Sequence, residues 1–174
     1  MRYKIKFYTY WHCGSGLSAG SSNDAMVVRD GKGLPFVPGR TIKGHLREMA
    51  ELIDDNNFIQ TCFGEADDKP SICFFTDAIC YADLEPNSIK YLFDSIISTK
   101  IDEESGVAKD DTLRSIEVVV PMTLYGSIEN LPSEFIAQMQ KVMRMVKRIG
   151  TQRNRGLGRC DIIPEGEKNE AYRI

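Results

Sequence analysis

Two segments with helical periodicity lie far apart in this chain, and strand-like segments flank each of them. In residues 41–53 and again in residues 133–149, apolar side chains recur every three or four positions, as on a helix with one buried face. Asn56-Asn57 closes the first of these segments. Residues 3–11 instead alternate apolar and polar side chains, which is typical of a strand with one buried face. This order restricts the chain to folds in which two amphipathic helices pack against a sheet.

Further strands are predicted at residues 71–82, 115–125 and 159–163. Residues 88–98 fit either a short helix or a strand, and the sequence leaves the choice open. The residues expected to form the core share the inward faces of the first strand and of the two helices: Tyr3, Ile5, Phe7, Trp11, Ile42, Leu46, Met49, Ile53, Phe135, Met139, Val142, Met143, Val146 and Ile149.

In simplified form the order of elements is β-α-β-β-α-β, so we expect an α+β fold with a ferredoxin-like, RRM-like core. The antiparallel sheet of that arrangement leaves one face free, and many RNA-binding modules carry aromatic and basic side chains there. Glycine-rich loops at residues 13–24 and 150–158 and a protruding hairpin at residues 99–114 complete the expected architecture. No repeat or linker divides the sequence, so residues 1–174 are expected to form a single domain.

Charge is unevenly distributed along the 174 residues. The chain has 22 Lys and Arg against 25 Asp and Glu, a formal net charge of −3, which argues against a protein whose whole surface binds nucleic acid. The acidic residues gather in residues 51–68 and 83–111, whereas the run from Lys141 to Arg159 holds seven basic residues and no acidic one. The sequence therefore predicts a local basic groove on an otherwise acidic protein.

The longest apolar runs are too short to cross a membrane, so no membrane association is expected. Met1 leads directly into Arg2-Tyr3-Lys4 without an apolar signal segment, and we expect a cytoplasmic protein.

Two other classes of site are disfavoured by spacing. The five cysteines form no C-x-x-C pair and are expected to fill apolar space rather than bind zinc. Residues 14–19 match G-x-G-x-x-A, but no helix is predicted to open there as a dinucleotide site requires. The chain also contains no G-x-x-x-x-G-K-[ST] motif, so no nucleotide cofactor is expected.

Two segments have the composition of phosphate-binding sites. In residues 37–47, Pro38-Gly39 precedes a predicted helix whose free N-terminal amides suit a phosphate. Lys43 and Arg47 lie one turn apart on that helix. A plain turn followed by a solvated helix face explains this segment equally well. In residues 147–159, Gly156 and Gly158 allow a ligand to approach the backbone closely, and the arginines can bind phosphates through paired hydrogen bonds. A basic helix end followed by a connecting loop explains part of the same pattern.

Taken together and in order, the motifs of this chain resemble those of the RAMP superfamily of CRISPR-associated proteins. The resemblance spans residues 3 to about 163. The segments that carry it, after the first glycine-rich loop, are Asp24–Asp30, Gly33–Gly39, Ile42–Arg47, Phe63-Gly64, Thr76–Ala78, Thr99–Glu117 and Arg155–Arg159.

Within this superfamily the chain is most similar to the backbone subunit of type III effector complexes. The resemblance implies a protein that assembles side by side with its own copies and with other effector subunits along a guide CRISPR RNA, which pairs with a target RNA. It further implies that residues 99–114 act as a thumb. The phosphate-binding residues it implies, together with the basic segments, are Arg40, Lys43, Arg47, Arg153, Arg155, Gly156, Gly158 and Arg159.

Asp24 occupies the position of an aspartate that supports cleavage of the bound target RNA in this subgroup. The resemblance thus implies a metal-dependent endoribonuclease in which a target 2′-OH attacks the adjacent phosphate, with a divalent cation such as Mg²⁺. An Asx turn in a polar loop is the alternative for Asp24.

Three other functions stay open on the sequence. The first is a structural or capping subunit that holds RNA without cleaving it. The second is a guide-processing endoribonuclease that uses His12 or His45, the only histidines, as general acid or base. The third is a small-molecule-binding domain of the same fold.

Overall fold

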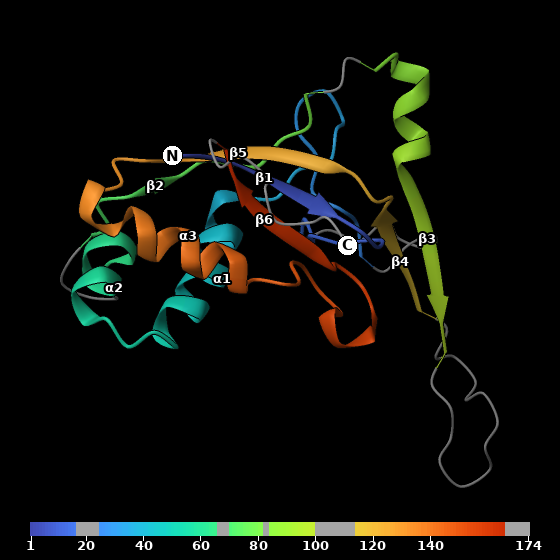
Figure 1. Ribbon diagram of the computed structural model, residues 1–174. Coiled ribbons are helices and arrows are strands. Elements are labelled where there is room, and N and C mark those ends of the chain that lie inside the picture. The colour runs from blue at the N-terminus through green and yellow to red at the C-terminus, as the bar shows by residue number, and fades with distance from the viewer. Residues whose placement is uncertain (17–24, 66–69, 82–83, 100–113, 166–174) are drawn as a thin grey trace, which may run out of the picture.

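The computed structural model describes residues 1–16, 25–65, 70–81, 84–99 and 114–165 (Figure 1). Its main sheet has four antiparallel strands in the order β2-β5-β1-β6, and a separate hairpin pairs β3 with β4. The elements are β1 (Arg2–Phe7), α1 (Gly39–Glu51), α2 (Asn56–Phe63), β2 (Phe74–Phe75), η1 (Pro86–Leu92), β3 (Phe93–Ser98), β4 (Arg114–Val119), β5 (Thr123–Glu129), η2 (Ser133–Phe135), α3 (Ile136–Met145), η3 (Arg153–Arg155) and β6 (Cys160–Pro164).

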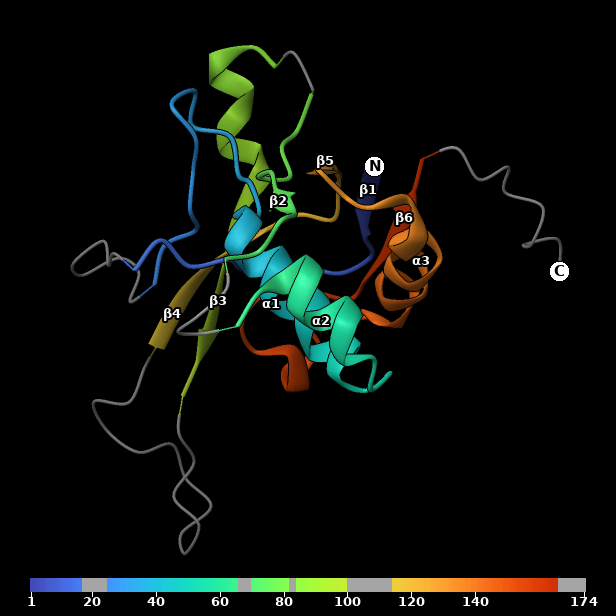
Figure 2. The ribbon, with the colours of Figure 1, turned by 90° about the vertical axis from the view of Figure 1, so that its left-hand side faces the viewer.

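The α-helices gather on one side of the main sheet, with α2 beside α1, while the β3–β4 hairpin stands apart at its far end (Figures 1 and 2). The expected α+β class is therefore confirmed: a four-stranded antiparallel sheet with helices and an added hairpin. None of the described helices is long and apolar enough to cross a membrane.

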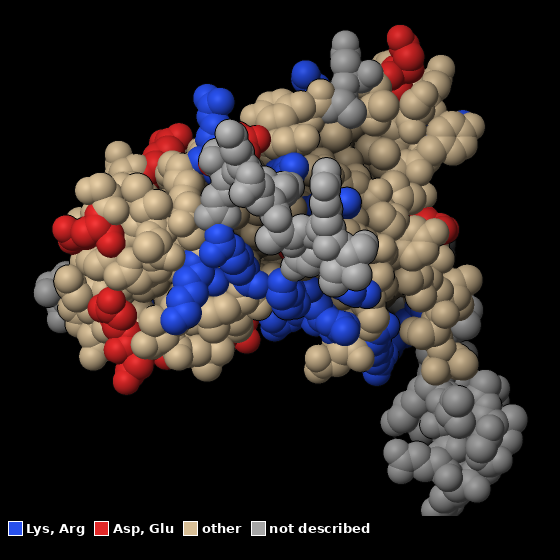
Figure 3. Space-filling model, in the orientation of Figure 1, with Lys and Arg blue, Asp and Glu red and all other residues tan. Residues whose placement is uncertain are grey.

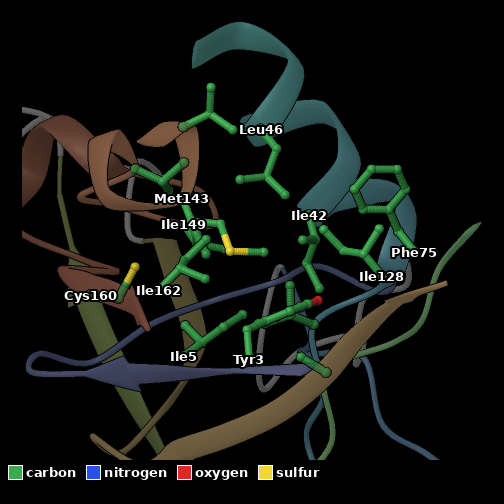
Figure 4. Close-up of a cluster of buried hydrophobic side chains, with 14 of the residues drawn as sticks. Tyr3, Ile5, Ile42, Leu46, Phe75, Ile128, Met143, Ile149, Cys160 and Ile162 are labelled. Carbon is green, nitrogen blue, oxygen red and sulfur yellow. The ribbon is translucent and has the colours of Figure 1, made fainter. Parts of the chain in front are cut away.

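The core lies between the sheet and α1 and α3 (Figure 4). Tyr3 and Ile5 of β1 point toward the helices and are fully buried, as is Leu46 of α1. Gly126 faces Tyr3 across the β1–β5 pair, and a Cβ there would lie 2.6 Å from the Tyr3 hydroxyl, so the glycine makes room for the ring. The predicted core faces are confirmed, except that Met49 and Ile53 are only half-buried at the core's margin.

Several predicted strands are shorter in the structure. The strand expected over residues 3–11 ends at Phe7, because the chain then bends so that Trp11 pairs with Val119 at the end of β4. The strand expected over residues 115–125 is two strands, β4 and β5, separated around Pro121, which has no N–H to donate to a ladder. In residues 71–82 only Phe74–Phe75 forms a strand, with single bridges beyond it.

The helices also differ from their predicted bounds. Asn56 begins α2 rather than closing α1, because the Asp55 side chain caps the new helix by accepting a hydrogen bond from the Phe58 amide at 3.1 Å. The second predicted helix ends at Met145, four residues early, since the amide of Ile149 pairs with the next loop instead. The sequence left residues 88–98 open between a short helix and a strand, and the structure contains both, because the helical turn η1 is followed directly by the strand β3.

Candidate nucleic-acid interface

The segment that joins α3 to β6, residues 147–159, is the most basic part of the chain and is called here the glycine-rich loop. Its two ends pair with each other, because the Ile149 amide donates to the Gly158 carbonyl at 2.9 Å and the Cys160 amide donates to the Lys147 carbonyl at 3.0 Å. The Gly158 amide also donates to the carbonyl of Tyr10 at 2.8 Å. These backbone bonds fix the loop against the segment that follows β1.

Two glycines of this loop are required by packing of the chain against itself. Gly150 has φ +100° and Gly158 has φ +71°, and a Cβ would overlap the carbonyl oxygens of His12 and Ile149, respectively. The close approach at Gly158 is therefore made by the loop's own backbone. Gly156, at φ +92°, has open space around its Cβ position, so room for a ligand exists there.

The glycine-rich loop lies between two open hollows. The first has a volume of about 800 Å³ and lies between α1 and the loop, with His45 and Glu48 on the helix side and Arg153 and Arg155 on the loop side. The second, of about 600 Å³, lies on the other side and is lined by Tyr8, Lys147, Arg148, Arg159, Cys160 and Asp161. Figure 3 shows Lys and Arg side chains in a band that runs from α3 towards η3, over this part of the molecule.

The cations of the loop differ in how strongly they are engaged within the protein. Arg153 lies 3.4 Å from the Glu48 carboxylate and 3.4 Å from Nδ1 of His45. Lys147 pairs with Asp161 at 2.8 Å. The side chain of Arg155 is exposed and makes no hydrogen bond or ion pair with any other described residue, so it is available to an anion.

His45 is a titratable group that lines the first hollow. Burial and the nearby Arg153 guanidinium lower the pKa of His45 below its usual value of 6.5, and Glu48 opposes this shift only in part. His45 is therefore neutral at pH 7 and contributes no charge to the basic surface.

The predicted cations of α1 lie on a different face of that helix from His45 and Glu48, and they do not line either hollow. Arg40 is exposed and Lys43 is half-buried. Arg47 donates to Glu51 at 3.1 Å and to the carbonyl of Gly64 at 3.2 Å. The structure thus brings Arg153 and Arg155 into one hollow and Arg159 into the other, apart from the α1 set.

Three of the amides at the start of α1, those of Gly39, Thr41 and Ile42, already have partners. The Gly39 amide donates to Oδ1 of Asp77 at 2.7 Å, and the amides of Thr41 and Ile42 donate to the Pro38 carbonyl. A carboxylate of the protein itself therefore occupies the position at which the sequence offered a phosphate site.

Asp24 lies outside the described residues, as does nearly all of the predicted thumb; the described chain resumes directly after Asp24, at Ala25. Glu117 of β4 is buried and accepts from the Val27 amide at 2.9 Å and from the Arg29 guanidinium at 2.5 Å. That guanidinium also lies 3.8 Å from the centre of the Phe93 ring. Glu117, which has this anchoring role, is not among the predicted site residues, although a lone acid between Ile116 and three valines is a sequence signal for a buried, paired carboxylate.

The two histidines differ in accessibility. His12 is 2% exposed, and its Nδ1 lies 2.6 Å from the carbonyl oxygen of Glu117. It is therefore a buried structural group, while His45 lines the first hollow.

No group of three or more His, Cys, Asp or Glu side chains suited to a metal ion occurs within the described part of the chain.

The fold and the site together define an α+β protein that carries a basic, glycine-rich loop beside its antiparallel sheet. Residues 4–161 match the family model of the RAMP superfamily. The chain therefore belongs to the RAMP superfamily, and the resemblance identified from its motifs is confirmed. No curated protein matches it significantly.

Two solved structures share the fold. A chain in the cryo-EM structure of the type III-B Cmr-beta complex bound to cognate target RNA aligns with a TM-score of 0.75 at 13% identity, over 93% of this chain and 95% of that one. A chain in the apo state of Cmr-beta aligns with a TM-score of 0.69 at 15% identity, over 92% of this chain and 95% of that one.

Proposed function

We propose that this protein is a guide-RNA-binding backbone subunit of a type III CRISPR effector complex, built on a ferredoxin-like core. Membership of the RAMP superfamily and the fold shared with chains of type III-B Cmr-beta support this assignment. The sheet order β2-β5-β1-β6 with α1 and α3 on one face is consistent with a ferredoxin-like topology.

The observation that carries the proposal is the first hollow, where Arg153 and Arg155 face open space beside α1. An RNA strand in this hollow would place a phosphate against the unpaired Arg155, and Arg153 could exchange its contact with Glu48 for a second phosphate. Arg40, Lys43 and Arg47 would contact a further stretch of the same strand, and Arg159 would contact the part that passes the second hollow. Copies of the protein arranged along the guide would join these short basic surfaces into one track.

The binding test compares two double variants that lose the same charge. Arg153→Ala with Arg155→Ala removes the cations of the first hollow, while Lys32→Ala with Lys90→Ala removes two exposed lysines outside both hollows. We expect the first variant to bind a fluorescein-labelled guide RNA at least tenfold more weakly and with a smaller salt dependence, because fewer counterions are released. Equal affinities for the two variants would overturn the assignment of RNA binding to this hollow.

We further propose that Asp24 supports cleavage of the bound target RNA. In this reaction the 2′-oxygen of the target bonds to the adjacent phosphorus while the P–O5′ bond breaks, and the 2′ proton is passed on as the 5′-oxygen gains one. The products are a 2′,3′-cyclic phosphate and a 5′-hydroxyl. Val27 and Arg29, which follow Asp24 in the chain, are both bonded to the buried Glu117, so the chain is anchored three to five residues after Asp24.

This activity is tested in the reconstituted effector complex with a complementary target RNA. Asp24→Asn should abolish cleavage without loss of target binding, and a 2′-deoxy substitution at the cut site should have the same effect. Asp54→Asn is the matched control, since Asp54 is exposed and its φ of 59° suits asparagine. We also expect chelation with EDTA to stop cleavage and added Mg²⁺ to restore it. Unchanged cleavage by Asp24→Asn would favour the purely structural subunit.

A guide-processing endoribonuclease is the second candidate, because His45 lines the first hollow with a lowered pKa and could act as a general base there. In that case the isolated protein should cut a CRISPR repeat hairpin at one site, and His45→Asn should abolish the cut. The backbone-subunit proposal expects no such cleavage.

A further inference from the structure

The face of the main sheet opposite the helices carries an unexpected set of side chains, called here the open face. Because side chains alternate along a strand, the even-numbered residues of β1 point away from the buried core, and they are Arg2, Lys4 and Lys6. Three cations therefore follow one another along a central strand of the sheet, opposite the face that α1 and α3 cover (Figure 1).

Aromatic side chains lie on the same face. Tyr125 of β5 stands directly across from Lys4, since these two residues are partners in the β1–β5 ladder. The ring of Tyr81, which is 71% exposed, lies 5.4 Å from the ring of Tyr125. Phe74 of β2 is 60% exposed and also points away from the core, since its neighbour Phe75 is buried.

The end of β1 links this face to the second hollow. Tyr8 continues the even-numbered row, with the Lys6 ammonium 5.3 Å and the Arg159 guanidinium 6.0 Å from its ring centre. Asp161, which stands across from Lys6 in the β1–β6 ladder, already accepts from the Tyr8 hydroxyl at 3.0 Å and from Lys147 at 2.8 Å. Asp161 is therefore engaged, and the cations here remain available to an external anion.

We propose that the open face binds a segment of single-stranded RNA, with its bases against Tyr125 and Tyr81 and its phosphates against Lys4 and Lys6. Cations beside aromatic rings, of which Tyr81 is exposed and Tyr125 half-buried, match the two parts of a nucleotide, because every base has a face that can stack and every phosphate carries a charge. A duplex hides its base faces and would not use the rings. The open face borders the second hollow, but it shares no residue with the first hollow and does not depend on the role proposed for Arg153 and Arg155.

Charge favours RNA over a second copy of the chain as the occupant of this face. In an interface between copies, Arg2, Lys4 and Lys6 would meet the acids of the same face, which among the described residues are Glu129 on β5, Asp161 opposite Lys6 and Glu165 beside Arg2, and Asp161 is already shared by Tyr8 and Lys147. An RNA strand supplies one negative charge per nucleotide instead.

The test measures binding of a fluorescein-labelled single-stranded oligouridine by anisotropy, with an RNA duplex of equal length as the second probe. The charge variant is Lys4→Gln with Lys6→Gln, which keeps the side-chain stems over the sheet. The ring variant is Tyr81→Ala with Tyr125→Leu. Lys4→Arg with Lys6→Arg is the conservative rescue, and Lys32→Ala with Lys90→Ala is the matched control for lost charge.

We expect the charge variant to lower affinity for oligouridine about tenfold and to reduce the salt slope by about 1.4, which corresponds to two phosphates of a single strand. The ring variant should lose about tenfold in affinity for oligouridine and little for the duplex. The Lys→Arg variant and the control should bind like the wild type. Ultraviolet cross-linking of the unmodified protein to oligouridine, mapped by mass spectrometry, should give adducts on Tyr125 or Tyr81.

The proposal would be overturned if the charge variant bound oligouridine with wild-type affinity and wild-type salt slope and the cross-links were confined to residues 147–159. So would a charge variant whose only change is its oligomeric state in sedimentation, because the face would then bind another protein. A failure of the proposal for the first hollow would be detected separately, because the Arg153→Ala, Arg155→Ala double variant would then bind guide RNA with wild-type affinity.

Discussion

The first turns of α1 and the glycine-rich loop both contain glycine and several cations, yet these residues make different contacts in the two regions. At α1 the amides of Gly39, Thr41 and Ile42 are bonded within the protein, with Asp77 as the acceptor for Gly39. In the loop the glycines allow the backbone to turn back on itself, and the space beside Arg155 stays open.

The difference shows that a glycine beside cations does not by itself mark a ligand site. Gly39 packs so closely on β2 that a Cβ would overlap the carbonyl oxygen of Phe75, and Gly158 does the same with Ile149. In both regions the glycine therefore serves the packing of the chain. What separates the regions is where the cations end up, along a regular helix in one and at the rim of a hollow in the other.

The largest effect is expected from Gly158→Ala, which tests whether the loop depends on its glycine. The substitution forces a side chain into the carbonyl of Ile149 at a φ of +71°, and it should lower the free energy of unfolding by about 3 kcal/mol or more. Urea denaturation measures this change. Gly44→Ala, in open space on α1, is the control and should raise stability by about 0.5–1 kcal/mol. A Gly158→Ala protein as stable as the wild type would show that the loop is not held as described.

The next effect concerns two cations, Arg40 and Arg155, that form no ion pair with a carboxylate among the described residues. Arg40 and Arg155 are both exposed, one in each region, and the double variant Arg40→Ala with Arg155→Ala should bind guide RNA about tenfold more weakly. Arg47→Ala should change affinity less, because Arg47 is already bonded to Glu51 and Gly64. Fluorescence anisotropy at two salt concentrations measures both variants. A larger loss for Arg47→Ala would reverse this order.

A smaller effect is expected at the start of α1. Asp77→Ala removes the carboxylate that accepts from the Gly39 amide, and stability should fall by about 1 kcal/mol. Because the amide then lacks an acceptor, added sulfate should stabilise the Asp77→Ala protein more than the wild type, as followed by thermal unfolding. Equal responses to sulfate would mean that the freed helix end does not attract an anion.

The smallest effect involves His45, which lies between the two regions. Its pKa is lowered in the folded protein, so the unfolded chain binds more protons between that lowered pKa and 6.5. Stability should therefore fall slightly as the pH decreases through this window and be unaffected by His45 above it. His45→Asn should remove that slope in denaturation curves recorded as a function of pH. A slope in the opposite direction would show that Glu48 outweighs burial and Arg153.

The core and the order of the elements were largely predictable from the sequence. Alternation placed Tyr3, Ile5 and Phe7 on the buried face of β1, and helical spacing did the same for Leu46 and Met143. Boundaries failed where a distant partner decides them. Val146 to Ile149 continue the helical pattern, for example, but they leave the helix because Ile149 pairs with Gly158.

The candidate site was only partly predictable for a similar reason. The basic run up to Arg159 is visible as composition, and so is its contrast with the acidic remainder of the chain. The partners of each cation are not visible, because Glu48 lies about a hundred positions from Arg153 and Glu117 lies 88 positions from Arg29. Nothing in the local sequence states which carboxylate will neutralise which guanidinium.

The α+β class, the inward faces of the helices and strands, and the location of the basic segment along the chain can all be read from the amino-acid sequence. These properties follow from periodicity and composition, which are local. The folded chain is needed to see that Asp77 accepts from the amide at the start of α1, that the loop borders two hollows, and that Lys4 and Tyr125 share one face of the sheet. Such features depend on contacts between residues far apart in the chain, and those contacts form only when the core packs.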